Sequence, residues 1–226
     1  MTFTWGHKTM ITIRHLSAAL AACALGLGLV STASAACPPG LPKGIVCGVP
    51  DAKLAPGGAY AIDPSHTAVI ARVSHIGYSL SIFRFGDVKA DLMWDPAQAS
   101  HSTLKVAVQT ASIATPVPDF ATELAGPQYL DSKDFPEATF VSTTFHQISP
   151  TKGKVDGIFT LKGKSKPVTL DVELVGAGPG FGSPRIGVHA SGWIDPRDFN
   201  MGPFFQVPIE LTIDAEFVKT PPAKAG

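Results

Sequence analysis

Hydrophobic and polar positions alternate most regularly in residues 153–176. Apolar residues or glycine hold positions 155, 157, 159 and 161, and apolar residues hold positions 168, 170, 172 and 174; the positions between are mostly polar. Successive side chains of a strand point to opposite faces, so each run has one apolar face. Gly163 and Pro167 separate the runs where a chain reversal needs special backbone angles, so the segment predicts a β-hairpin. Because an isolated hairpin is marginal in water, other strands must cover its apolar face.

The same alternation predicts further strands along the chain. They occupy residues 60–63, 67–75, 83–93, 104–109, 138–145, 186–194 and 207–217. In residues 67–75 we expect the face that carries Thr67 and His75 to point inward. Residues 118–124 predict one short helix, with Asp119 as its N-terminal cap and Gly126 after its end. About eight strands and a single short helix indicate an antiparallel all-β domain.

The predicted inward faces carry almost no charge and contain several small or mildly polar residues. These are Ala71, Ser142, Thr144, Gly157, Ala190 and Gly192. Two packed sheets would fill their interior with side chains, whereas a closed barrel of about eight strands is wide enough to hold one small ligand. Small inward residues leave space, so we expect a barrel that encloses a slender apolar molecule. A filled β-sandwich stays open as the alternative.

Composition narrows the function classes. Lys plus Arg and Asp plus Glu number 18 each in 226 residues, so the formal net charge is zero. Without a basic field to hold a phosphate backbone, nucleic-acid binding is not expected. The chain also lacks a G-x-S-x-G elbow, an H-E-x-x-H motif and a glycine-rich phosphate loop. We therefore predict no catalytic residues and no enzyme activity.

The first 35 residues have the pattern of a signal peptide. Basic residues precede an apolar run at 16–30, and small residues at 33–35 fit a cleavage site. We therefore expect export to the periplasm, with Met10 as an alternative start. A membrane anchor is less favoured because the apolar run is short for a bilayer. The residues before Cys23 also resemble a lipoprotein box, although apolar sequence continues past it.

Two cysteines, Cys37 and Cys47, remain after such a cleavage. An even pair in an exported chain is most simply a disulfide. A metal or redox role is less favoured because no His, Asp or Glu lies between them. Residues 36–58 are otherwise rich in Pro and Gly, so we interpret them as an extension rather than a second domain.

Five groups of residues, in this order, resemble the YceI-like family of exported polyisoprenoid-binding proteins. They are Tyr60-Ala-Ile-Asp63-Pro64-x-His66-Thr67 with Val73-x-His75-x-Gly77; Phe83-x-Phe85-Gly86; Asp131-Ser132-x-Asp134-Phe135-Pro136-x-Ala138-Thr139-Phe140-x-Ser142; Val155-x-Gly157-x-Phe159-Thr160-Leu161-x-Gly163-x-x-Lys166-Pro167-Val168; and Arg197-Asp198-Phe199-Asn200-Met201-Gly202. The resemblance covers nearly all of residues 59–218. We place the domain at 59–220 and a flexible tail at 221–226.

The resemblance implies an extended, lipocalin-like barrel of eight antiparallel strands, with a tunnel for a long isoprenoid or another amphiphilic chain and no catalytic residues. Ala71 stands where the family usually has Phe, and Pro196 is an extra proline before Arg197. A smaller wall residue at position 71 would widen the tunnel. The residues that we expect to contact the ligand are Thr67, Val69, Val73, His75, Phe83, Phe85, Phe140, Ser142, Gly157, Phe159, Leu161 and Phe199.

Four histidines are the obvious metal or catalytic candidates: His66, His75, His146 and His189. Their odd spacing puts His66 and His75 on opposite faces of one predicted strand, so these two cannot share a site without a bulge. We predict no metal site. We expect His66 to bond backbone near the Asp63 turn, and His75 either to contact the ligand at a tunnel end or to be a satisfied core residue.

These features predict a non-enzymatic periplasmic carrier that sequesters a polyisoprenoid, an isoprenoid quinone or a fatty-acid derivative. No cofactor is expected apart from such a bound lipid or quinone. Thr67, His75, Ser142 and Thr144 are the polar groups expected to orient a head group. A homodimer and transient membrane contact fit this role. The competing hypothesis is a ligand-free β-sandwich that binds a protein or glycan partner, and a continuous internal cavity separates the two.

Overall fold

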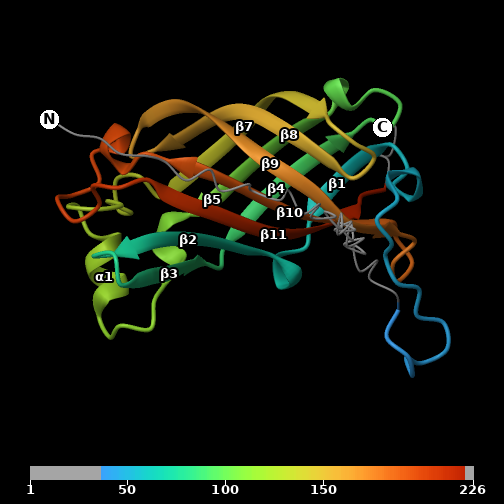
Figure 1. The fold of residues 1–226 in the computed structure, drawn as a ribbon, viewed down its shortest axis with the longest axis horizontal. Helices are drawn as coiled ribbons and strands as arrows, with labels where there is room; N and C mark the ends of the chain where they lie inside the picture. Colours follow the sequence, from blue (N-terminus) through green and yellow to red (C-terminus); the bar gives the residue numbers. More distant parts are fainter. Residues whose placement is uncertain (1–36, 222–226) are drawn as a thin grey trace, which may run out of the picture. The chain divides into compact units, whose positions relative to one another are not determined.

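The fold is a closed antiparallel β-barrel (Figure 1). The computed structural model describes residues 37–221, so the predicted signal peptide and most of the predicted tail lie outside the described residues. The strands are β1 Gly58–Ile62, β2 Ala68–His75, β3 Ser79–Phe85, β4 Val88–Trp94, β5 Thr103–Gln109, β6 Ile113–Ala114, β7 Glu137–Gln147, β8 Lys152–Leu161, β9 Lys164–Gly178, β10 Arg185–Ile194 and β11 Ile209–Lys219. The helices within this range are α1 Phe120–Ala125 and the short 3-10 helices η1 Ala52–Leu54, η2 Pro64–His66, η3 Ala99–His101, η4 Thr110–Ser112 and η5 Pro196–Phe199.

Eight of the strands close the barrel. Each pairs with the next in the order β1, β4, β5, β7, β8, β9, β10 and β11. The last strand returns to the first through the pairs Tyr60↔Lys219 and Ile62↔Phe217. The predicted all-β class and eight-stranded barrel are therefore confirmed, and the sandwich alternative is wrong because a single sheet closes on itself.

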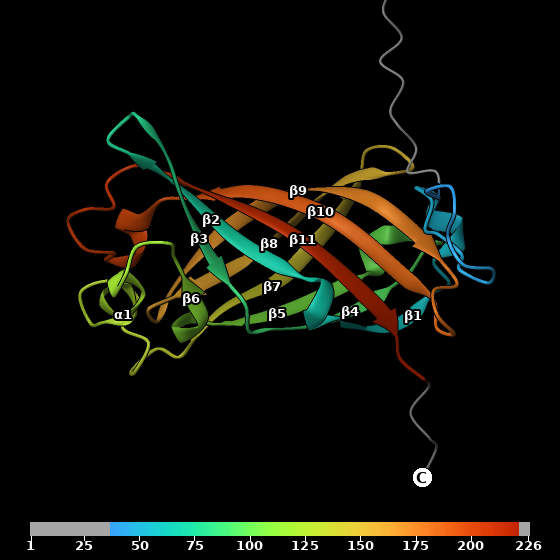
Figure 2. The ribbon, with the colours of Figure 1, turned by 90° about the horizontal axis from the view of Figure 1, so that it is seen from below.

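Three strands continue the sheet at one end of the barrel. The first half of β11 pairs with β2 instead of β1, from Glu210↔Arg72 to Asp214↔Ala68. β3 pairs with β2 along its whole length, and the short β6 pairs with the end of β3. Figure 2 shows the β2–β3 hairpin at the same end of the barrel as α1.

The inward faces follow the period of two that the sequence shows. On β4, Val88, Ala90 and Leu92 are buried, while Lys89 and Asp91 are exposed. Buried side chains form one cluster at the α1 end of the barrel and a second cluster toward the other end. The first cluster, which we call the plug, consists of Ala71, Val73, Phe83, Ile113, Leu124, Tyr129, Leu130, Leu161, Ile194, Phe199, Met201, Phe205 and Ile209.

The central hairpin is confirmed, although the chain reverses earlier than its sequence suggests. Lys162 and Gly163 join β8 to β9 and both have positive φ angles, 49° and 69°, as a tight two-residue hairpin turn requires. Pro167 therefore lies within β9, opposite Ile158. At this point β9 has a neighbour on one side only, because its pairing with β10 begins at Asp171, and such a position tolerates a missing N–H.

The predicted inward direction of Thr144 is wrong. A bulge in β7 falls between Ser142 and Thr144, and an extra residue in one strand reverses the alternation beyond it. Thr144 consequently pairs with Asp156, whose side chain is 40% exposed. Phe145 pairs with buried Val155 and points into the barrel instead.

The short helix is present, but Asp119 does not cap it as predicted. Its backbone is left-handed, with φ 61°, and its carboxylate accepts no capping hydrogen bond. The Asp119 carbonyl accepts the Glu123 amide instead, at 3.3 Å. Within residues 37–221 no helix has the length and apolar character that crossing a bilayer requires.

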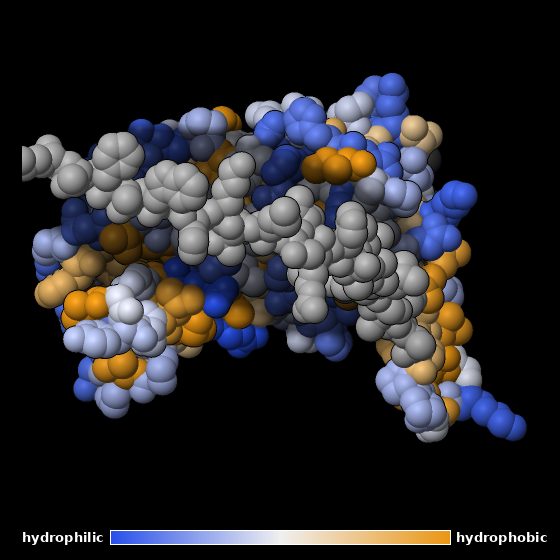
Figure 3. Space-filling model, viewed as in Figure 1, coloured by the Kyte–Doolittle hydropathy of each residue, from blue (hydrophilic) through white to orange (hydrophobic). Residues whose placement is uncertain are grey.

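The extension lies against the barrel. Cys37 and Cys47 form the predicted disulfide, with their Cα atoms 5.5 Å apart. Val49 then pairs with Ala177 at the end of β9, and η1 follows directly. Figure 3 shows apolar surface along this segment on the right. Among the apolar residues of the extension, Leu41 and Val46 are exposed.

Candidate binding cavity

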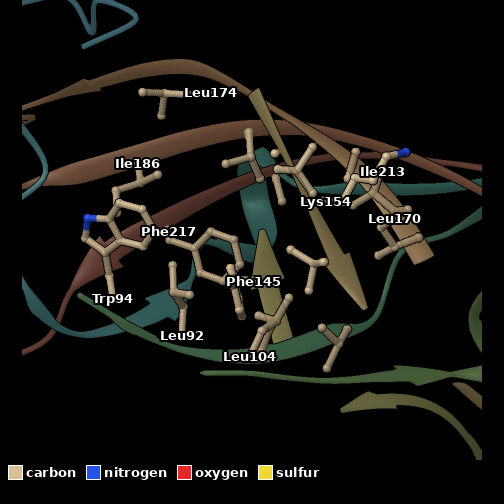
Figure 4. Close-up of a pocket in the computed structure, with 18 of the residues that line it drawn as sticks. Leu92, Trp94, Leu104, Phe145, Lys154, Leu170, Leu174, Ile186, Ile213 and Phe217 are labelled. Carbon is tan, nitrogen blue, oxygen red and sulfur yellow. The ribbon is translucent and has the colours of Figure 1, made fainter. Parts of the chain in front are cut away.

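A cavity of about 240 Å³ lies inside the barrel. All eight barrel strands contribute to its wall, and Figure 4 shows side chains from different strands, among them Leu92, Leu104, Phe145 and Phe217, pointing toward a common space. Aliphatic and aromatic side chains dominate this wall, so it offers an apolar chain close contacts and few hydrogen bonds. The volume is space for on the order of ten water-sized groups, which suits a slender chain.

Small inward residues keep the cavity open. Ala90, Ala190 and Ala215 line it from three different strands, and each is at least nine-tenths buried. A larger side chain at any of these positions would occupy the volume that now lies in front of the alanine methyl group. Of the small inward residues that the sequence analysis named, Ala190 is the one that lines the cavity.

Two inward glycines, Gly157 and Gly192, do not leave empty space as the alanines do. Each of them leaves room for a large side chain of the neighbouring strand to lie along the wall. A Cβ atom on Gly157 would overlap the ring of Phe140 and lie 2.7 Å from the Val141 carbonyl oxygen. A Cβ atom on Gly192 would lie 2.7 Å from Leu170 Cδ2. Phe140 and Leu170 both line the cavity, so each glycine holds a larger side chain against the wall.

The cavity ends at the plug beside α1. Phe159 lines the cavity, and its ring meets Phe199 of the plug edge-on, with 5.4 Å between the ring centroids. Phe199, Leu124 and Tyr129 are no more than 2% exposed. A chain that enters the barrel cannot pass this end without unfolding the plug.

The opposite end reaches the surface beside the β7–β8 turn. Exposed Gln147 and Lys152 line the cavity there, together with half-buried Ser149. Within the described chain, the titratable residues that line the cavity are His146, Lys152 and Lys154, and all three lie beside this turn. The cavity is therefore apolar along its length and polar at its mouth.

Carboxylates pair with these three basic groups on the outer face of the barrel beside the mouth. Lys152 pairs with Glu173 at 3.4 Å, and Lys154 pairs with Asp171. His146 Nε2 lies 2.8 Å from an Asp156 oxygen. The Thr169 hydroxyl and His146 both bond Asp156 and lower the pKa of its carboxyl group. Local pairing of this kind leaves little net charge beside the mouth.

Four of the predicted contact residues line the cavity: Thr67, Val69, Phe140 and Phe159. The other eight are not part of its wall: Val73, His75, Phe83, Phe85, Ser142, Gly157, Leu161 and Phe199. Most of these do point inward, but they belong to the plug or pack against it. Ala71 is also a plug residue, so its small side chain does not widen the cavity as expected.

The predicted head-group anchors are engaged elsewhere. The Thr67 hydroxyl donates to the Asp63 carbonyl at 2.8 Å, and the Ser142 hydroxyl accepts the Leu104 amide at 2.8 Å. His75 is exposed on the β2–β3 hairpin, and Thr144 points outward. Sequence reasoning instead missed the β7–β8 turn, whose Ser149-Pro150 signal identifies a turn but not its position over the cavity. It also missed Ala52 and Ala55, for which no sequence signal exists.

A group of ionisable side chains lies outside the cavity. Asp63, His66 and Glu216 bring their ligand atoms within 4.8 Å of one another. Arg185 Nη1 donates to Asp63 at 2.9 Å and also to Glu216. The hydrogen bond from Arg185 to Asp63, with a smaller contribution from His66, lowers the pKa of Asp63 to about 2. The guanidinium already supplies the positive charge that a metal ion would bring, so we interpret the group as an ion-pair network. We expected the His66 side chain to bond backbone near the Asp63 turn, but its Nδ1 instead lies 3.0 Å from an oxygen of the Asp63 carboxylate.

A closed antiparallel barrel with an apolar interior and a polar mouth has the architecture of proteins that hold a small ligand inside a β-barrel. The chain belongs to the YceI-like family, whose domain model matches residues 60–218. Protein YceI of Salmonella arizonae is 34% identical over 167 residues, which are 71% of this chain and 86% of that protein.

Two solved structures share the fold. BcnA of Burkholderia cenocepacia is 25% identical with a TM-score of 0.60, over 70% of this chain and 99% of that chain. A polyisoprenoid binding domain from Saccharophagus degradans, implicated in plant cell wall breakdown, is 11% identical with a TM-score of 0.53, over 72% of this chain and 98% of that chain. The second likeness concerns the fold alone.

Proposed function

We propose that this protein is a non-enzymatic carrier that sequesters one long apolar chain inside the barrel. The chain is a polyisoprenoid, an isoprenoid quinone or a fatty-acid derivative. The observation that supports this most directly is the apolar cavity, which all eight barrel strands line and which opens beside the polar β7–β8 turn. A protein that acts only through its outer surface has no use for such a cavity, so the carrier is favoured over the interaction module.

The energetics of burial fit this role. Each methylene moved from water into the cavity contributes about 0.8 kcal/mol. Roughly ten methylenes would contribute about 8 kcal/mol, which corresponds to micromolar binding before ordering costs are subtracted. The tail of the ligand lies along the wall, and its head group lies at the mouth near Gln147, Ser149 and Lys152.

The periplasm is the compartment that suits such a carrier. The signal-peptide pattern of residues 1–35 directs export, and a disulfide persists in an oxidising compartment. A water-insoluble ligand has to be collected from a membrane, so the carrier makes transient contact with one. A second copy of the chain is a further partner that this role accommodates.

The proposal predicts that a larger side chain in the cavity wall blocks uptake. Ala90→Phe places a ring in the cavity from β4 and is expected to weaken farnesol or ubiquinone binding by at least about tenfold, because several ligand methylenes lose their place. Ala107→Phe is the matched control, since it adds the same ring outside the cavity. Both variants are compared by ligand titration, and thermal unfolding checks that each is folded.

Trp94 supplies the readout for this titration. It lines the cavity, and in a Trp193→Phe background it is the only tryptophan of residues 37–221. Its fluorescence is expected to change on uptake. In parallel, mass spectrometry of an organic-solvent extract of the purified protein identifies any lipid carried from the cell. A clean extract, together with no fluorescence response to either probe, would contradict the carrier function.

A further inference from the structure

The extension contributes directly to the cavity. Ala52 and Ala55 both line it, and Ala55 is only 2% exposed. The family model begins at residue 60, so this part of the wall comes from outside the family domain. Figure 2 shows the segment at the end of the barrel near β1, away from α1.

The segment is held in place by side chains of three barrel strands, which donate hydrogen bonds to its backbone carbonyls. The indole N–H of Trp94 donates to the Ala55 carbonyl at 3.1 Å. The Tyr60 hydroxyl donates to the Pro56 carbonyl at 2.6 Å, and Lys219 Nζ donates to the same carbonyl at 3.1 Å. Three hydrogen bonds from different strands hold residues 55 and 56 against the barrel, so this segment is a fixed part of the wall and not a flexible linker.

A close approach of two glycines seats the segment on β9. Val49 and Ala177 exchange two backbone hydrogen bonds, at 3.0 and 2.8 Å, and Ala177 is fully buried. Beside them, a Cβ atom on Gly176 would lie 3.1 Å from the Gly48 backbone. Since this distance is tighter than an ordinary Cβ contact, even a Cβ atom at position 176 would require the segment to shift slightly, and a branched side chain would require a larger shift.

We propose that residues 48–57 form an end wall that limits the length of the apolar chain that the cavity accepts. The plug closes the α1 end, the end wall closes the side beside β1 and β4, and the β7–β8 turn is left as the mouth. Ala52 is the residue that sets the limit, because its side chain lines the cavity and is less tightly buried than that of Ala55. This inference rests on the proposed carrier function and adds that the end wall selects ligands by the length of their apolar chain.

The test compares Ala52→Leu with Lys53→Leu, which adds the same side chain at an exposed position outside the lining. The probes are all-trans isoprenoid alcohols of increasing length, from farnesol through geranylgeraniol to longer homologues, titrated with Trp94 as reporter. Affinity for the unmodified protein should rise with length and then level off. For Ala52→Leu it should level off earlier, with a loss of about fourfold for each methylene that no longer fits. Lys53→Leu should match the unmodified protein.

A second variant tests the opposite change, in which the end wall is displaced instead of enlarged. Gly176→Val is expected to displace the segment, seen as faster hydrogen exchange of the Ala177 amide, and to let affinity keep rising for the longer probes. Gly187→Ala is its control, because a Cβ atom there meets nothing closer than 3.7 Å. The inference is overturned if Ala52→Leu keeps the parental length limit, or if a displaced segment leaves that limit unchanged. If no probe binds the unmodified protein, the carrier function fails as well.

Discussion

Individual residues decide whether the barrel interior is hollow, and residue size alone does not predict which ones do so. Ala90, Ala190 and Ala215 leave volume in the cavity. Gly157 leaves none, because the Phe140 ring lies over it. The difference depends on the neighbour across the strand pair, since Phe140 and Gly157 are separated in sequence but lie on adjacent strands β7 and β8.

At this scale we predict that Gly157→Ala both destabilises the protein and narrows the cavity. The added methyl group meets a backbone carbonyl and forces the Phe140 ring toward the cavity centre. Such overpacking typically costs about 1–3 kcal/mol. Urea unfolding and the Trp94 titration measure the two effects. Gly187→Ala serves as control, and equal stability and uptake in both variants would show that Phe140 does not depend on Gly157.

Among the elements, the β2–β3 hairpin is the one that the barrel leaves most exposed. Its tip carries Ile76 and Tyr78, which are 82% and 90% exposed. β6 pairs with β3 only at Arg84 and Phe85, so residues 79–83 have a neighbouring strand on the β2 side only. A free edge with exposed apolar residues is a template for association with another chain.

We therefore predict that the double substitution Ile76→Ser and Tyr78→Ser reduces concentration-dependent self-association. Sedimentation velocity over a range of protein concentrations measures this directly. The folded stability should change by less than about 0.5 kcal/mol, because neither side chain is packed in the core. Ile158→Ser, on the outer face of β8, is the control. A parent protein that stays monomeric at every concentration would contradict the prediction.

On the scale of the whole molecule, the Arg185 network ties together segments that meet only after the barrel closes. Arg185 begins β10, Asp63 follows β1, and Glu216 lies in β11. The bond to Arg185 lowers the pKa of Asp63 from 3.8 to about 2. Because the folded pKa lies below the unfolded one, the stabilisation is complete above pH 4 and is lost as the pH falls toward 2.

We predict that Asp63→Asn removes this part of the acid sensitivity. The variant should be less stable than the parent at pH 6 by on the order of 1 kcal/mol. The difference between the two should shrink as the pH falls from about 4 to about 2, because the parent then loses its own ion pair. Urea unfolding of both proteins across this pH range measures the difference in their free energies of unfolding. A difference that does not change with pH would show that the carboxylate charge is not the cause.

The sequence by itself determined most of the strands, the apolar face of most of them, the all-β class and the disulfide, whereas the barrel was favoured over the sandwich mainly by the family resemblance. These features depend on local alternation, on turn residues such as Gly163, and on the count of cysteines, which a linear reading contains. Its errors fall where one inserted residue changes a direction, as at the Ser142 bulge, or where a backbone angle departs from the usual one, as at Asp119. The predicted strand at 83–93 is in fact two strands, β3 and β4, and β6 was not predicted.

Only the tertiary structure decided which inward residues enclose space and which fill it. Phe83, Leu161 and Val106 have the same alternating pattern, yet the first two belong to the plug and the third lines the cavity. The placement of Ala55 against Trp94 and the β7–β8 turn at the mouth likewise depend on chain segments that meet once the barrel has closed. The physical reason is that alternation fixes the face on which a side chain lies, whereas packing depends on neighbours from distant parts of the chain.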